Sequence, residues 1–158
     1  WKWLFIYPEQ NIASVNRLVI PVGVPVRFTL TSASVMNAFF VPQLGSMIYT
    51  MNGMATQLNL KADEPRTVMG LSTMFSGNGF ADMHFKTDAV PIADFNAWAQ
   101  GTKSGGGPPL SSQAYKDLSV QSMNVAPFTY SSVEPGLFGK VVMQQLPPGP
   151  GPSSKGGF

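Results

Sequence analysis

The sequence contains no cysteine and a single histidine, His84. The absence of thiols excludes disulfides, zinc knuckles, iron–sulfur clusters, cysteine nucleophiles and copper sites built on thiolate. His84 stands in a strand-like run and no G-x-S-x-G motif accompanies it, so a serine hydrolase lacks its signature as well. We therefore expect no catalytic, cofactor-binding or metal-binding residue in this chain.

Charge is also scarce, because only 11% of the 158 residues are charged against roughly 25% in average soluble proteins. The net charge of +2 comes from ten basic and eight acidic residues spread along the chain, which argues against nucleic acid as a partner. No window approaches the roughly 20 apolar residues that a membrane helix needs. Since the chain starts at Trp1 without a signal peptide, we expect a fragment of a longer protein.

The first ninety residues have the pattern of antiparallel β-structure. Aromatic residues alternate from Trp1 to Tyr7, and this run stops at Pro8. Further strands are predicted where short runs are bounded by proline and glycine, at residues 16–20, 24–31, 38–41, 56–61, 67–71 and 83–87. This spacing predicts a mainly β fold, a Greek-key sandwich or barrel, and an immunoglobulin-like module has the same periodicity.

Helical spacing begins after residue 90. Apolar residues recur along 91–100, which predicts a helix, and 101–109 are predicted to form a flexible linker. A second helix is predicted over 111–120 with Ser111 or Ser112 as its cap, and a third from Pro135 up to Pro147. The last stretch, 147–158, is rich in proline, glycine and serine, so we expect it to be disordered.

Three separated blocks, residues 1–9, 34–45 and 70–83, carry a family resemblance that extends over about residues 1–145. They resemble subunit II of the haem–copper terminal oxidases, in the branch of the bacterial cytochrome bo type ubiquinol oxidase. The resemblance implies a cupredoxin-like domain over 1–90, a helical, aromatic-rich C-terminal appendix over 91–146 and a tail over 147–158. It further implies that the cupredoxin-like domain lacks a dinuclear copper site.

The cytochrome c oxidase branch of this family holds two copper ions with one upstream histidine and a C-x-E-x-C-x3-H-x2-M loop. The corresponding positions in this sequence are Asn37, Ser72, Met74, Ser76, Phe80 and Met83. Of these side chains only that of Met83 could ligate copper, and soft copper needs thiolate and imidazole donors that the other positions lack. The six positions are therefore predicted to be the remains of a copper site. Spacing alone predicts that Met74, Phe80 and Met83 fill it as an apolar plug.

Methionine crowds the β region at positions 36, 47, 51, 54, 69, 74 and 83. Clusters of methionine can hold Cu(I) without cysteine, which leaves a second interpretation open. The same adaptable side chains also suit a surface that packs against a partner.

The resemblance implies the periplasmic domain of a quinol oxidase subunit, at the bacterial inner membrane and following two transmembrane helices. It implies an enzyme complex that couples quinol oxidation and oxygen reduction to proton pumping, with haem and copper in subunit I. The domain itself is expected to be non-catalytic, to bind subunit I and other subunits, and to dock no cytochrome c, since acidic residues are few. The alternatives are a soluble cupredoxin-like copper carrier or electron-transfer protein and an adhesion module.

Overall fold

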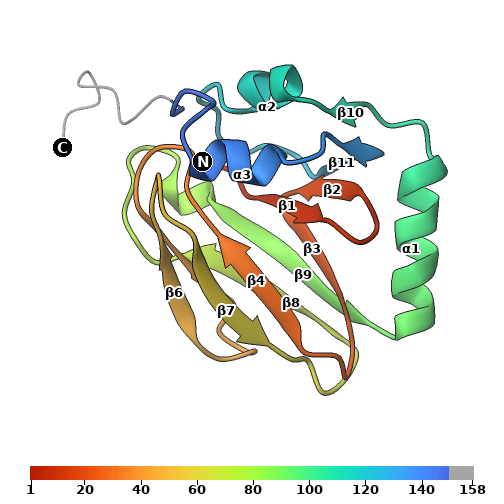
Figure 1. Cartoon of the computed structure of the whole chain (residues 1–158). Coiled ribbons are helices and arrows are strands. Elements are labelled where there is room, and N and C mark those ends of the chain that lie inside the picture. The colour runs from red at the N-terminus through yellow and green to blue at the C-terminus, as the bar shows by residue number, and fades with distance from the viewer. Residues whose placement is uncertain (150–158) are drawn as a thin grey trace.

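The computed structural model describes residues 1–149 and confirms a mainly β fold (Figure 1). The β-rich part consists of β1 (Leu4–Tyr7), β2 (Ile12–Val15), β3 (Arg17–Pro21), β4 (Val26–Leu30), β5 (Asn37–Phe40), β6 (Met47–Thr50), β7 (Thr56–Leu60), β8 (Arg66–Ser72), the short 3-10 helix η1 (Phe80–Asp82) and β9 (His84–Val90). The rest consists of α1 (Ile92–Ser104), β10 (Pro109–Leu110), α2 (Ser112–Leu118), β11 (Phe128–Tyr130), β12 (Ser132–Val133) and α3 (Leu137–Val142). None of the helices in the described part of the chain has the length and apolar character to cross a membrane.

The largest sheet has five strands in the order β3-β9-β8-β5-β6, with β3 parallel to β9 and the other neighbours antiparallel. Strands β4 and β7 pair antiparallel in a separate two-stranded sheet. Strands β1, β2 and β11 form a three-stranded sheet at the upper end in Figure 1. Strand β11 pairs with β2, so the C-terminal region completes a sheet that the N-terminus begins.

The alternating aromatics of the N-terminal run point into the core. Trp3, Phe5 and Tyr7 are all buried, and Phe85 packs edge-on against Trp3 and Phe5 with ring centroids 5.5 and 5.0 Å apart. This confirms the predicted one-sided strand, but the strand begins at Leu4 and Trp1 lies outside it. A strand with apolar side chains on one face buries that face against the opposite sheet.

Strands β2 and β6 are not predicted by the sequence pattern. All four residues of β2 are buried, so the strand shows no alternation of polar and apolar side chains. Asn11 and Asn16 flank β2 with positive φ angles of 55° and 56°, a conformation that asparagine tolerates. The chain turns at Asn11 between β1 and β2 and at Asn16 between β2 and β3. A strand buried on both faces cannot be recognised by a period of two.

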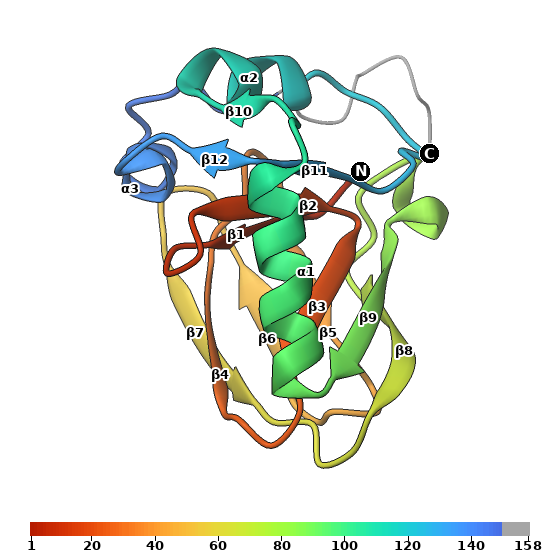
Figure 2. The ribbon, with the colours of Figure 1, turned by 90° about the vertical axis from the view of Figure 1, so that its right-hand side faces the viewer.

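The prediction of a flexible linker over 101–109 is wrong. Helix α1 continues through Gly101 to Ser104, and Pro109–Leu110 form the strand that pairs with β12. Gly101 lowers helix propensity by about 1 kcal/mol, but the helix is held against the sheet by its buried residues Phe95 and Ala99. Figure 2 shows α1 running along β3 for much of its length.

The C-terminal elements pack around a second, smaller core. Of the two predicted caps of helix α2, Ser111 is the one observed, and its hydroxyl accepts a hydrogen bond of 3.1 Å from the Ala114 amide. The third helix is shorter than predicted at both ends. Gly136 precedes it with a φ of 74°, and Gln144, with a φ of 57°, follows its last residue, Val142, by two positions. Of the tail predicted to be disordered, residues 150–158 lie outside the described part, and the Gly149 amide donates to the Ala33 carbonyl at 2.8 Å. This core is formed by Ala13, Val15, Leu110, Tyr115, Tyr130, Leu137, Val141 and Leu146.

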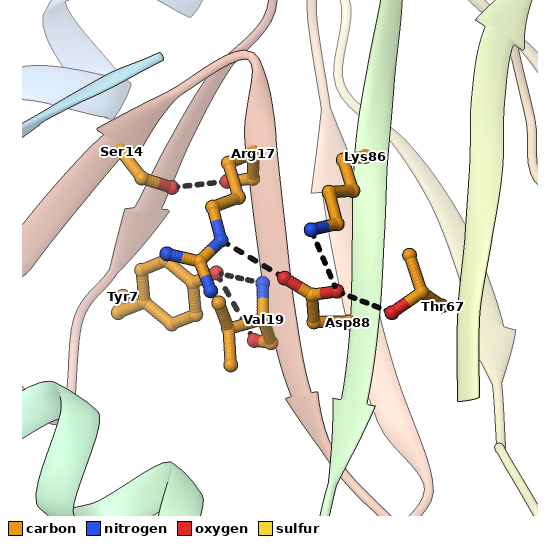
Figure 3. A network of polar contacts seen from close by, with 7 residues as sticks. All are labelled: Tyr7, Ser14, Arg17, Val19, Thr67, Lys86 and Asp88. Atoms are coloured by element: carbon orange, nitrogen blue, oxygen red, sulfur yellow. Dashed lines mark hydrogen bonds and ion pairs between the residues drawn. The ribbon is translucent and has the colours of Figure 1, made fainter. Parts of the chain in front are cut away.

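A polar network joins the three strands β3, β9 and β8 (Figure 3). The Asp88 carboxylate accepts hydrogen bonds from Arg17 Nε at 2.9 Å and from the Thr67 hydroxyl at 2.7 Å, and Lys86 Nζ lies 3.8 Å away. Burial alone would raise the pKa of Asp88, but these hydrogen bonds and the two cations outweigh it and keep the pKa below its usual value.

The side chain of Tyr7 forms hydrogen bonds with the backbone at the outer edge of β3. The Tyr7 hydroxyl accepts a hydrogen bond from the Val19 amide at 2.9 Å and donates one to the Val19 carbonyl at 3.0 Å. Both backbone groups of Val19 are therefore satisfied without a neighbouring strand. Tyr7 thus links the small sheet to the edge of the large one.

Candidate functional site

The residues at the predicted copper-site positions come from the start of β5 and from the loop between β8 and β9. Asn37 is the first residue of β5, Ser72 the last of β8, and Met83 directly precedes β9. Strands β5 and β8 are antiparallel neighbours, so the end of one lies beside the start of the other. Sheet pairing thereby brings together residues 35 positions apart.

The first two positions are in direct contact. The Ser72 hydroxyl lies 3.2 Å from the Asn37 side-chain oxygen and also 3.3 Å from the Ala38 amide nitrogen. Asn37 is 8% exposed and Ser72 2%, so the contact is shielded from water. The Asn37 amide group donates to the Val35 carbonyl at 3.3 Å. The Asn37 and Ser72 side chains therefore both take part in hydrogen bonds between uncharged groups.

The loop from Thr73 to Met83 folds back over this contact. The Met74 amide lies 3.4 Å from the Ser72 hydroxyl, and the Ser72 amide donates to the Met83 carbonyl at 3.4 Å. Met83 is buried and belongs to the main core, whereas the Met74 and Phe80 side chains are half-buried. The Phe80 ring packs edge-on against Phe75, with centroids 5.5 Å apart.

Ser76 is the residue predicted to correspond to the second cysteine of the copper loop. Its side chain is buried, and within residues 1–149 its hydroxyl has no hydrogen-bond partner. The Ser76 carbonyl accepts a hydrogen bond of 3.0 Å from the indole of Trp1. The alternation of Trp1 with Trp3, Phe5 and Tyr7 predicts a strand that starts at Trp1, so the sequence pattern does not place Trp1 at this site.

The donor set does not fit a dinuclear copper centre. The chain has no cysteine, and its only histidine, His84, is exposed on β9 with Nδ1 3.3 Å from the Asp82 carbonyl. Residues 1–149 contain no group of three or more His, Cys, Asp or Glu side chains that could hold a metal ion. Two serine hydroxyls, an asparagine and a phenylalanine ring supply neither the charge nor the soft donors that copper requires.

Most other methionines of the β region lie on the surface. Met47, Met54 and Met69 are exposed, on β6, the following turn and β8. The Thr73 hydroxyl lies 2.8 Å from the Met47 sulfur. The Cu(I) interpretation still rests on the number of methionines in the sequence.

Comparison with known proteins shows the family to which the chain belongs. Residues 7–91 match the family described as cytochrome C oxidase subunit II, periplasmic domain, and residues 105–149 match the COX Aromatic Rich Motif. The chain is 54% identical to ubiquinol oxidase subunit 2 of Acetobacter aceti, covering 90% of this chain and 46% of that protein. It is 49% identical to cytochrome bo(3) ubiquinol oxidase subunit 2 of Pseudomonas aeruginosa, covering 90% and 43%.

Among solved structures, the periplasmic domain of subunit II of cytochrome oxidase (CoxB) of Bradyrhizobium japonicum has a TM-score of 0.60 and 25% identity. The match covers 63% of this chain and 84% of that structure. The fold is therefore that of the cupredoxin-like domains of oxidase subunits II. The chain belongs to the family of cytochrome c oxidase subunit II periplasmic domains, and the predicted resemblance to the quinol-oxidase subunits is confirmed. It spans about half the length of the curated relatives it matches.

Proposed function

We propose that this chain is the copper-free periplasmic part of subunit II of a terminal quinol oxidase, and that it carries no electrons itself. In this proposal the complete protein is anchored in the bacterial inner membrane by preceding transmembrane helices. The domain then binds subunit I, where haem and copper reduce oxygen with electrons from quinol and protons are pumped. Its own role is in the structure and assembly of the complex.

The observation that carries the copper-free assignment is the hydrogen-bonded pair Asn37 and Ser72. These side chains stand at two of the metal-ligand positions of the family's copper-bearing branch, yet they are buried and bonded to each other and to backbone groups. A buried polar group is stable when its hydrogen bonds are satisfied, so this arrangement needs no metal to hold it. The alternative of a copper carrier has no comparable support.

The assembly role is supported by exposed apolar side chains close to the same loop. Phe75 is 69% exposed on the β8–β9 loop, and Val120 and Met123 are exposed in the segment after α2. Lys2 contacts the Val120 carbonyl while its neighbour Trp1 contacts the β8–β9 loop, so the two segments lie near each other. An exposed apolar patch of this kind is typical of a surface that another protein covers.

Purification of the complete parent protein from detergent-solubilised membranes tests the proposal. We expect b-type and o-type haem to be recovered with it, together with quinol-driven oxygen uptake that cyanide inhibits. Phe75→Ser should lower the amount of haem recovered per subunit II, while Tyr49→Ser, a substitution of another exposed aromatic residue on β6, should leave it unchanged. A parent protein recovered as a haem-free monomer would contradict the proposal.

A further inference from the structure

Trp1 covers the loop that occupies the copper-loop position. Its indole nitrogen donates to the Ser76 carbonyl at 3.0 Å, and its ring lies directly over Gly79. A Cβ atom built on Gly79 would fall 2.2 to 2.5 Å from three atoms of the Trp1 ring, far inside van der Waals contact. Trp1 itself is half-buried, so its ring is packed between this loop and the core.

The neighbouring residue ties the same N-terminal stretch to the C-terminal region. Lys2 Nζ donates to the Val120 carbonyl at 2.8 Å and to the Ser122 hydroxyl at 2.5 Å. Asn16 strengthens the connection, since its side chain accepts from the Trp3 amide at 2.8 Å and donates to the Val125 carbonyl at 2.8 Å. Trp1 and Lys2 thus contact two segments that contain no strand, the β8–β9 loop and residues 119–125.

We propose that Trp1 is the positioning residue that fixes the β8–β9 loop, so that an indole ring orders a loop that a metal centre orders elsewhere in the family. Together with Lys2, it joins this loop and residues 119–125 into one preformed surface. The inference rests on the proposed absence of copper. In it, the Trp1 side chain replaces the metal in holding the β8–β9 loop.

Gly79 offers a way to test the contact separately from backbone strain. Its φ of −89° is open to any residue, so the Trp1 ring is what forbids a side chain at this position. Gly77 differs, because its φ of +111° disfavours any other residue whether or not Trp1 is present. Alanine at Gly79 should therefore disturb the loop only while the indole is there.

Amide hydrogen exchange of chain 1–158 in the presence of EDTA measures the effect. The reporters are the amides of Phe80, Asp82 and Met83, each of which donates a hydrogen bond of 3.1 Å within the loop. We expect Gly79→Ala and Trp1→Ala each to accelerate their exchange about tenfold, and the double variant to exchange within about twofold of Trp1→Ala alone. Gly77→Ala should accelerate exchange in both backgrounds.

Two controls separate a local effect from unfolding. Amides in β3 and β9 should keep their protection, and Trp98→Phe, a change of another half-buried indole, should leave the reporters unchanged. Trp1→Phe keeps a ring but loses the hydrogen bond to Ser76, and we expect about threefold faster exchange. This variant decides the question if Trp1→Ala does not fold.

The inference would be overturned if Gly79→Ala accelerated amide exchange equally in the natural chain and in the Trp1→Ala variant. It would also be overturned if exchange of the reporter amides were unchanged in Trp1→Ala. Where that variant does not fold, unchanged exchange in Trp1→Phe has the same meaning. The proposed absence of copper is judged by another measurement, exchange with added Cu(II) instead of EDTA. Copper-dependent protection of the loop would overturn the copper-free assignment and leave the Trp1–Gly79 coupling measurable in its own right. The two failures are therefore distinguishable.

Discussion

The Ser72 hydroxyl and the Asn37 side-chain oxygen lie 3.2 Å apart, although 35 residues separate them in the sequence. Their contact exists because β5 and β8 pair antiparallel and place the end of one strand beside the start of the other. The family resemblance predicts that these positions correspond to a histidine and a cysteine of the copper-bearing branch. Under the proposed copper-free function, the fold keeps the arrangement of these two positions, and their side chains are neutral hydrogen-bonding partners.

Reintroducing the donors tests this retained arrangement. We expect no intense visible band when Cu(II) is added to the natural chain, because no thiolate is present to give charge transfer. A variant with Asn37→His, Ser72→Cys, Met74→Glu, Ser76→Cys and Phe80→His should take up copper and become intensely coloured, as visible absorption and metal analysis will record. The matched control keeps Ser72 and Ser76 and should stay colourless. A folded five-site variant that binds no copper would count against a retained site.

The network around Asp88 predicts a pH-dependent contribution to stability. Asp88→Asn should lower the free energy of unfolding by about 1–3 kcal/mol at neutral pH. Asparagine has no charge and only one acceptor oxygen, so it cannot accept the hydrogen bonds from both Arg17 and Thr67. The pKa of Asp88 lies below its usual value of 3.8 in the folded state. Its contribution is therefore complete above about pH 4–5 and disappears as the pH falls through the lowered pKa.

Urea unfolding at a series of pH values checks this prediction. Asp63→Asn is the control, since Asp63 is exposed and lies 4.0 Å from Lys61, and exposed pairs contribute about 0–1 kcal/mol. The difference between Asp88→Asn and the natural chain should shrink as the solution is acidified. A difference that stays constant down to pH 2 would contradict a role for the ionised carboxylate.

The sequence was sufficient for the fold class, the one-sided aromatic strand and the cap at Ser111, because each depends on neighbouring residues. The correspondence of Asn37 and five positions from Ser72 to Met83 to copper-ligand positions comes from the family resemblance and stays a prediction. Trp1 and strand β11 could not be predicted in the same way. Trp1 meets Ser76 across 75 residues, and β11 pairs with a strand that begins at Ile12, so both contacts depend on tertiary structure.

Gly70 is predicted to be essential for packing. A Cβ on this residue would lie 2.1 to 2.7 Å from three ring atoms of Phe85, which is 1% exposed and cannot move aside. Gly70→Ala should therefore lower the free energy of unfolding by about 1–3 kcal/mol, as expected for overpacking. Gly101→Ala is the matched control, because nothing lies within 4 Å of a Cβ there. In helix α1 it should raise stability by about 0.5–1 kcal/mol in thermal unfolding.

The hydrogen bonds between the Tyr7 hydroxyl and the Val19 backbone stabilise the edge of β3. Tyr7→Phe leaves the amide and carbonyl of Val19 without their partner, so it should lower the free energy of unfolding by about 1–3 kcal/mol. Tyr49→Phe, at an exposed position, should have no measurable effect. Burial raises the pKa of Tyr7 to about 12, above its usual value of 10.0.

The neutral hydroxyl therefore stabilises the fold fully below pH 10, and this contribution is lost as the pH rises from 10 towards 12. Urea unfolding of the natural chain and of Tyr7→Phe should show a gap in stability that is constant from pH 7 to 9 and narrows above pH 10. Spectrophotometric titration should show one tyrosine in the natural chain that ionises only near pH 12. A gap that does not narrow, or a Tyr7 that ionises near pH 10, would mean that its hydroxyl is not buried against Val19.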